Sequence, residues 1–157
     1  MSDVKWLAEH EEVAWRRILE FHSRLLARLD CELSEKNGLT MDEYEVLVIL
    51  SEANGEQVRM AQIAEAALIS RSGATRRVDH MASAGLVEKN ICLEDRRGVT
   101  VQLTPLGWER IRDAAPAHLA SVRKYVFDNI APEELAKFSA HLATFIERLE
   151  EAESKQS

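Results

Sequence analysis

The spacing of apolar residues changes at Gly85, and this change limits the possible folds more than any other feature of the chain. Before Gly85, apolar residues recur every three or four positions, as on one face of a helix. After it, residues 86–93 and 99–104 follow an alternating pattern, and the stretch EDRRG lies between them. We therefore predict a helix that ends at Gly85 and a two-stranded antiparallel hairpin that follows it.

Two shorter helices are expected immediately before the hairpin. Residues 60–68 form the first, Ile69 and Ser70 form a tight turn, and Ser70 caps a second helix over 71–84. Residues 56–59 are expected to be only a link into the first of these helices. A helix, a tight turn, a helix and a hairpin in this order indicate a winged helix-turn-helix.

Long helices are expected on the N-terminal side of this unit. Residues 4–35 carry two adjacent apolar stripes at helical spacing, which is more apolar surface than one packing contact would cover. Thr40 and Glu43 have the spacing of a capping box, so a further helix is expected over 41–53.

The C-terminal third is also expected to be helical. Thr104 and Pro105 begin a helix, with breaks at Pro116 and at residues 131–132. Residues 135–149 carry apolar side chains spaced alternately three and four apart, as in a short coiled-coil seam. The predicted fold class is mainly α with a small antiparallel β-hairpin, in a single domain over residues 1–157.

Charge is unevenly distributed along the chain. The whole chain carries −7, whereas residues 70–104 carry six basic and four acidic residues and are net positive. A local positive zone in an acidic chain bears on partners and association rates rather than on the fold.

The helix over 71–84 presents two different faces. Ala74, Val78 and Met81 are spaced to pack into a core. The remaining residues near its N-terminus suit contacts with base edges and phosphates of DNA. These candidate DNA-binding residues are Ser70, Arg71, Ser72, Gly73, Thr75, Arg76 and Arg77. The alternative is an ordinary amphipathic helix in which Arg76 pairs with Asp79 or His80.

Two arginines occupy the turn of the predicted hairpin. Arg96 and Arg97 are not needed for packing there, and a narrow minor groove attracts arginine. Asp95 beside them would repel phosphate unless it braces an arginine. The alternative is a charged turn that contacts only water.

The stretches ISRSGATRRVDHMASAGLVEK and DRRGVTVQLTPLG resemble the MarR (multiple antibiotic resistance regulator) family of bacterial transcription factors. The resemblance implies a homodimer, held by helices in residues 1–36 and 106–157, with residues 40–105 as the DNA-binding part on a pseudo-palindromic operator. It implies a repressor that a small aromatic or phenolic ligand releases. By position, Ser72, Thr75 and Arg76 match the major-groove side of the family's recognition helix. Arg97 matches its minor-groove arginine, and Asp95 the acidic residue that supports it.

One departure from the family pattern falls on the recognition helix. Arg77 stands where an apolar residue is common in the family. Its stem is expected to pack against the protein and its head to meet a phosphate.

The family resemblance also suggests where a ligand would bind. Trp15, His22 and Tyr44 are candidate walls of a pocket, and Arg59 or Arg16 is a candidate partner for a carboxylate. The alternative is that Trp15 and Tyr44 are core residues. A redox role for Cys31 or Cys92 is not expected, because neither has the basic surroundings that lower a thiol pKa.

Other function classes find little support in the sequence. The histidines lack metal-binding spacing, and no phosphate loop or nucleophile motif is present, so we expect no metal, no cofactor and no enzyme activity. No stretch is apolar enough to span a membrane, and the opening lacks the pattern of a signal peptide, so a cytoplasmic protein is expected. Two alternatives stay open: a winged-helix module that binds protein, and a ligand-binding protein without DNA contact.

Overall fold

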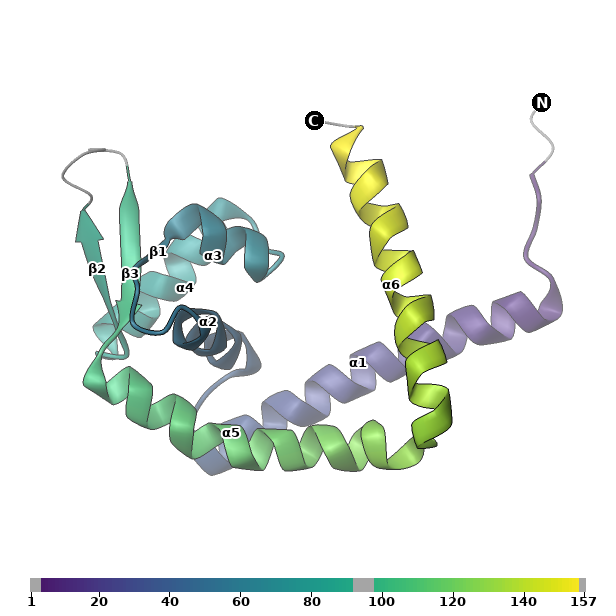
Figure 1. Cartoon of the computed structure of the whole chain (residues 1–157), viewed down its shortest axis with the longest axis horizontal. Helices are drawn as coiled ribbons and strands as arrows, with labels where there is room; N and C mark the ends of the chain where they lie inside the picture. The colour runs from purple at the N-terminus through teal and green to yellow at the C-terminus, as the bar shows by residue number, and fades with distance from the viewer. Residues whose placement is uncertain (1–3, 92–97, 156–157) are drawn as a thin grey trace. The chain divides into compact units, whose positions relative to one another are not determined.

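The computed structural model describes residues 4–91 and 98–155 (Figure 1). They fall into two compact units, one up to Leu119 and one from Ala120. The first unit contains α1 (Glu9–Asn37), α2 (Met41–Glu52), α3 (Met60–Ala66), α4 (Arg71–Ser83), a small sheet and most of α5 (Pro105–Tyr125). The second contains the end of α5, a 3₁₀ turn (Phe127–Asn129) and α6 (Pro132–Ser154). The predicted fold class is confirmed.

The helix ends follow local sequence signals. At the start of α2, Thr40 Oγ1 accepts a hydrogen bond from the Glu43 N–H at 3.2 Å, and the Glu43 carboxylate accepts from the Thr40 N–H at 2.9 Å, as the capping box predicts. α1 begins at Glu9, later than expected, and ends where Gly38 adopts a left-handed conformation with φ of 64°.

The core of the first unit is built around α2. Val46, Leu47 and Leu50 are almost completely buried, together with Ile63 of α3 and Val101 of the sheet. Burial on more than one side of α2 explains why its apolar residues are not confined to one narrow stripe.

The sheet has three strands, one more than the hairpin that the sequence predicts. β2 (Val87–Ile91) and β3 (Val99–Leu103) form the hairpin, and β1 (Val58–Arg59) pairs antiparallel with the other edge of β3. The residues expected to be a link therefore include a strand. The buried Thr100 of β3 donates a hydrogen bond from Oγ1 to Gln57 Oε1 at 2.6 Å, which fixes this pairing.

The expected break at Pro116 is wrong, because α5 continues through it. Proline removes one backbone donor and costs roughly 3 kcal/mol inside a helix. Ile111 and Ala114, one turn earlier, are buried in the core, and this packing holds the helix across the proline. The break at residues 131–132 is confirmed, since α6 begins at Pro132.

Gly107 in the first turn of α5 marks a close approach of two backbone segments. A Cβ atom at this position would lie 2.1 Å from the carbonyl oxygen of Leu86. Thr104 caps the same helix, and its Oγ1 accepts from the Gly107 N–H at 3.0 Å. The start of α5 is thereby fixed against the beginning of the hairpin.

Candidate nucleic-acid interface

The inner face of α4 is fixed in the core. Ala74, Val78 and Met81 have no exposed surface, as their spacing predicts. The helix is capped by Ser70, whose Oγ accepts a hydrogen bond from the Gly73 N–H at 3.1 Å. Since one face is buried along about two turns, the opposite face has a defined direction.

That opposite face carries Arg71, Ser72, Thr75 and Arg76, and all four are exposed. Neither the Arg71 nor the Arg76 guanidinium forms a hydrogen bond or ion pair with any residue in the part of the chain that the structure describes. The structure therefore does not show the alternative considered from the sequence, in which Arg76 pairs with Asp79 or His80. The Thr75 hydroxyl donates to the Arg71 carbonyl oxygen at 2.9 Å, so its oxygen keeps acceptor capacity.

The presence of glycine at position 73 has a structural explanation within the protein itself. A Cβ atom there would lie 3.1 Å from Ser70 Oγ, the atom that caps α4. The absence of a side chain therefore leaves room for the cap, whether or not a DNA backbone also approaches this turn.

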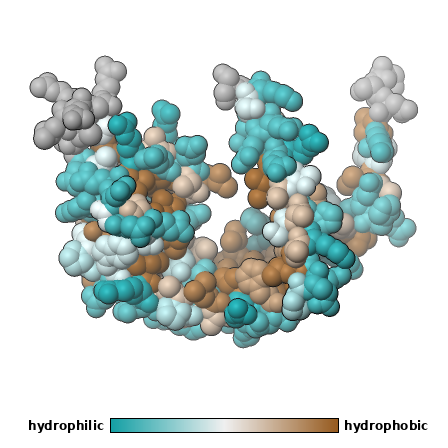
Figure 2. Space-filling view, viewed as in Figure 1, coloured by the Kyte–Doolittle hydropathy of each residue, from teal (hydrophilic) through white to brown (hydrophobic). Residues whose placement is uncertain are grey.

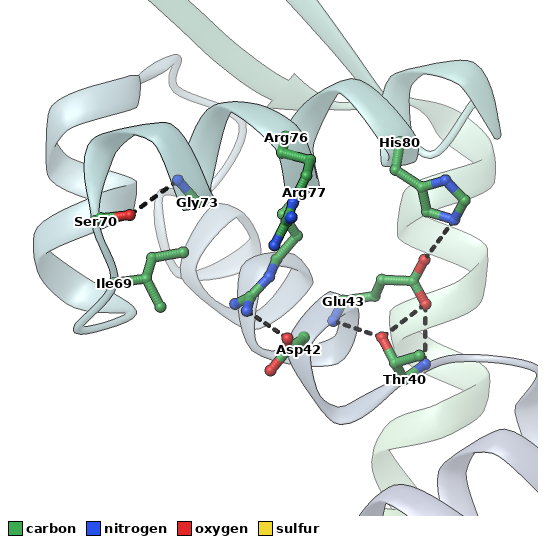
Figure 3. A pocket seen from close by; sticks show the side chains of 9 residues that line it. All are labelled: Thr40, Asp42, Glu43, Ile69, Ser70, Gly73, Arg76, Arg77 and His80. Carbon is green, nitrogen blue, oxygen red and sulfur yellow. Dashed lines mark hydrogen bonds and ion pairs between the residues drawn. The ribbon is translucent and has the colours of Figure 1, made fainter.

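For Arg77 the structure corrects the expectation of a phosphate contact. Its side chain is only 16% exposed and is paired with the Asp42 carboxylate of α2 (Figure 3). Glu45 Oε2 of the same helix lies 3.8 Å from Nη1. The stem packs as expected, but the head is directed into a contact between two helices of the same chain. Local spacing could not reveal this, because Asp42 lies 35 residues earlier.

The hairpin is connected to α4 by an ion pair that the sequence pattern did not reveal. Lys89 Nζ of β2 contacts Asp79 Oδ1 of α4. This ion pair occupies Lys89, the basic residue of β2 that could otherwise add to the positive face. The expected tip residues Asp95, Arg96 and Arg97, and also Cys92, lie outside the described residues.

Two grooves flank α4. One, of about 440 Å³, lies between α4 and the sheet and is lined by Arg59, Arg71, Thr75, Asp79 and Lys89 among others. The other, of about 600 Å³, lies between α4 and the start of α2 and is lined by Thr40, Asp42, Arg76 and His80 among others (Figure 3). Basic groups and carboxylates are thus present in both grooves beside the helix.

The residues expected to form a ligand pocket are not gathered in one place, although Trp15 and Arg16 line the same groove. Arg59 lines the groove beside α4, whereas Trp15 lines a separate groove with Trp6, Leu7 and Leu19 at the start of α1. His22 is exposed on α1, and Tyr44 is buried in α2, as its core alternative predicts.

Tyr44 packs against His118 of α5, a histidine that no sequence pattern indicated. The two rings have centroids 4.4 Å apart. Burial lowers the pKa of His118, and its Nδ1 has no hydrogen-bond partner within residues 4–91 and 98–155. Burial likewise raises the pKa of the Tyr44 hydroxyl, so it disfavours the charged form of both rings.

Cys31 is exposed, and its Sγ lies 3.3 Å from Oε1 of Glu35. The hydrogen bond and the charge of Glu35 raise the pKa of the thiol. A raised pKa disfavours the reactive thiolate, which agrees with the absence of basic surroundings in the sequence.

Metal-binding and membrane-spanning features are both absent from the described residues. These residues contain no group of three or more histidine, cysteine or acidic side chains placed to hold a metal ion. Their helices are each too short or too polar to cross a bilayer.

Comparisons with known proteins agree on one family. Residues 37–98 match the profile of the MarR family. The chain is similar to AbsC, a MarR family transcriptional regulator from Streptomyces coelicolor, with 39% identity, 94% of this chain and 99% of that chain covered, and a TM-score of 0.89. It is also similar to Sco3205, a MarR family regulator of the same organism solved in complex with DNA, with 32% identity, 95% and 93% covered, and a TM-score of 0.90. A further relative is the HTH-type transcriptional repressor YetL of Bacillus subtilis (strain 168), 26% identical over 112 residues, which span 71% of this chain and 66% of YetL.

Proposed function

The chain belongs to the MarR family of transcriptional regulators, and from this membership we propose that it binds operator DNA as a homodimer through α4 and the β2–β3 hairpin. The observation that carries the proposal is the outer face of α4. Two arginines without protein partners among the described residues and two hydroxyl-bearing side chains lie there, on a helix whose other face is fixed in the core. Such a helix can enter a major groove and present its N-terminal residues to base edges.

The proposed contacts divide by chemistry. We propose that Arg76 reads a base edge and that Arg71, Ser72 and Thr75 contact phosphates or single base atoms. Ser70 contributes to DNA binding by capping α4, and Gly73 contributes by leaving room for that cap. For the hairpin tip we propose that Arg97 enters the minor groove, with Asp95 and Arg96 beside it.

Apolar surface on α1 and α6 supports the proposed dimer. Apolar side chains, brown in Figure 2, remain uncovered along the long helices, and α6 has no buried residue. The apolar side chains of its seam are Leu135, Phe138, Leu142, Phe145 and Leu149, all at least 36% exposed. On α1, Trp15, Ile18 and Phe21 are about half exposed. A second copy of the chain would cover these faces and present two α4 helices to a pseudo-palindromic operator, about 34–36 Å apart.

We further propose that the protein acts as a repressor in the cytoplasm, without enzyme activity of its own, and that a small aromatic or phenolic ligand releases it from DNA. The names of its relatives support repression, and the ligand class is the one implied by the family resemblance. Of the expected pocket residues, Tyr44 has the surroundings that best support binding of an aromatic ligand. The ring of His118 lies beside it, and Nδ1 of that ring has no hydrogen-bond partner in the described part of the chain.

Duplex binding can be tested by fluorescence anisotropy in a salt series. A labelled duplex selected by the protein from a random-sequence library should bind with an affinity that falls steeply as salt increases, because phosphate contacts release counterions. Arg97→Ala should weaken binding at every salt concentration. Binding that is equally tight for unrelated duplexes would contradict a sequence-specific regulator. Absence of salt-dependent duplex binding would favour a module that binds protein.

A further inference from the structure

Arg77 lies at the boundary between the buried and exposed faces of α4. It follows Arg76 directly in the chain, yet its side chain is 16% exposed while that of Arg76 is open to solvent. Residues that adjoin in a helix point about 100° apart, so the two arginines leave α4 in different directions. Only one of them is directed away from the protein.

The Arg77 guanidinium is held by two carboxylates of one helix. Nη2 hydrogen bonds Asp42 Oδ2, and Nη1 lies 3.8 Å from Glu45 Oε2. Asp42 and Glu45 are three residues apart on α2 and therefore share one face of that helix. A planar guanidinium can engage both, whereas a lysine ammonium offers only a point charge.

A second contact joins the same two helices. His80, one turn further along α4, has its Nε2 3.4 Å from Glu43 Oε1 (Figure 3). Glu43 also closes the capping box with Thr40, so its carboxylate is itself fixed. The first turn of α2 thus holds α4 at two successive points along its length.

The charge of Arg77 is compensated within the protein. Two carboxylates face one guanidinium, which gives the three groups a net negative charge and leaves little attraction for a phosphate. Nη1 is buried and has no hydrogen-bond partner in the described part of the chain, so this atom is not directed to solvent either.

Fixing the rotation of α4 matters for its neighbour. The Arg76 guanidinium lies at the end of a long side chain, so a small rotation of α4 about its axis moves it much further than it moves the backbone. Hydrogen bonds to base edges weaken steeply when distance and angle change. A contact that fixes this rotation therefore controls how well Arg76 meets a base.

We propose that Arg77 is a positioning residue that holds α4 against Asp42 and Glu45 of α2 and does not itself contact DNA. This inference rests on the proposed function, because its consequence is measured in DNA affinity. It also explains why arginine is suitable where the family pattern has an apolar residue: here the neighbouring helix presents two acids at this position.

The test compares two arginines of the same helix, with the duplex selected from a random-sequence library as the probe. Arg77→Met should lower affinity roughly 3- to 30-fold, the size of effect that residues outside a ligand contact produce. It should leave the slope of log affinity against log salt unchanged, because every phosphate remains bound as before. Arg71→Met, the matched change on the exposed face, should reduce that slope by about 0.9 for each phosphate that the arginine neutralised. A reduced slope for Arg77→Met would overturn the proposal.

A double-mutant cycle with Asp42→Asn tests the pair itself. If the two residues act together, Arg77→Met combined with Asp42→Asn should bind no more weakly than Arg77→Met alone. Arg77→Lys should restore part of the affinity, since one carboxylate can still be engaged. Additive effects in the cycle would overturn the proposal even if each single variant binds weakly.

The same experiment includes controls for folding. Affinities are compared at a temperature where circular dichroism shows every variant to be folded, and Arg24→Met, which removes an ion pair with Glu20 at 2.8 Å on α1, serves as a control for the loss of any such pair. Should Arg77→Met fail to fold, Arg77→Lys and Asp42→Asn carry the comparison. Absence of duplex binding by the unmodified protein would refute the proposed function itself. Normal binding by Arg77→Met in a protein that does bind DNA would refute only the positioning role.

Discussion

At the scale of single residues, Arg76 and Arg77 differ in what surrounds them rather than in their chemistry. Spacing along the helix identified the buried set Ala74, Val78 and Met81, because that set depends only on local periodicity. It could not separate the two arginines, because the partners of Arg77 come from another helix. The sequence therefore predicts which face of α4 is outward, but not which basic residues on its margin are free.

Arg76→Ala should relax base preference at one position in each operator half-site. If Arg76 bridges the acceptors of a guanine, its removal should cost roughly 1–3 kcal/mol of discrimination there. The measurement is a repeat of the library selection with the variant, followed by comparison of base frequencies. A variant with unchanged base frequencies and uniformly weaker binding would place Arg76 on a phosphate instead.

His118 should make stability depend on pH. Because burial lowers its pKa in the folded protein, the unfolded chain binds the proton more readily in the range just below the ordinary histidine value of 6.5. The free energy of unfolding should therefore fall as pH decreases below about 6.5, and His118→Phe should make that fall shallower. Urea unfolding at several pH values tests this, with His10→Phe at an exposed position as the control. Equal pH dependence in the two variants would contradict a role for His118.

At the scale of elements, sequence signals that lie within a few residues were sufficient to predict where three of the helices begin. The caps at Thr40, Ser70 and Thr104 all form as their sequences predict. The errors fall where distant contacts decide. β1 exists because β3 offers it an edge, and α5 continues through Pro116 because the preceding turn is buried. Neither contact can be recognised from the residues that adjoin it in the sequence.

Thr40→Ala should destabilise the protein by about 0.5–2 kcal/mol, since it removes the side chain that caps α2. The same cap fixes Glu43, so a modest loss of DNA affinity should accompany the loss of stability. Thermal unfolding and anisotropy measure the two effects, and Thr144→Ala, on α6, is the matched control. Unchanged stability in Thr40→Ala would show that the capping box contributes little to α2.

At the scale of the whole molecule, the acidic total and the proposed DNA contact are compatible because the charges are separated along the chain. Residues 70–104 are net positive although the whole chain carries −7. The remaining acidity falls mainly outside this zone in the sequence, although Asp42 of α2 lines the groove beside α4. The apolar faces of α1 and α6 are the other large feature at this scale, and the proposed second copy would cover both.

Phe145→Glu should shift the protein from dimer towards monomer. Placing a carboxylate in the α6 seam removes an aromatic anchor and buries a charge, and an anchor of this kind is worth about 2 kcal/mol or more. Sedimentation velocity over a range of concentrations should show a dimer dissociation constant at least about 30-fold higher than for the control Glu147→Gln. An unmodified protein that stays monomeric at every concentration would refute the dimer.

The central place of β3 has a further consequence. β3 pairs with β2 on one edge and β1 on the other, and β1 ends at Arg59 where α3 begins at Met60. Because β1 leads directly into α3, we expect the strands of the hairpin and the helix-turn-helix to move together when they contact a DNA groove. The duplex would then have to deform to fit the protein. The protein should therefore prefer operators in which bending or twisting the uncontacted base steps costs little free energy.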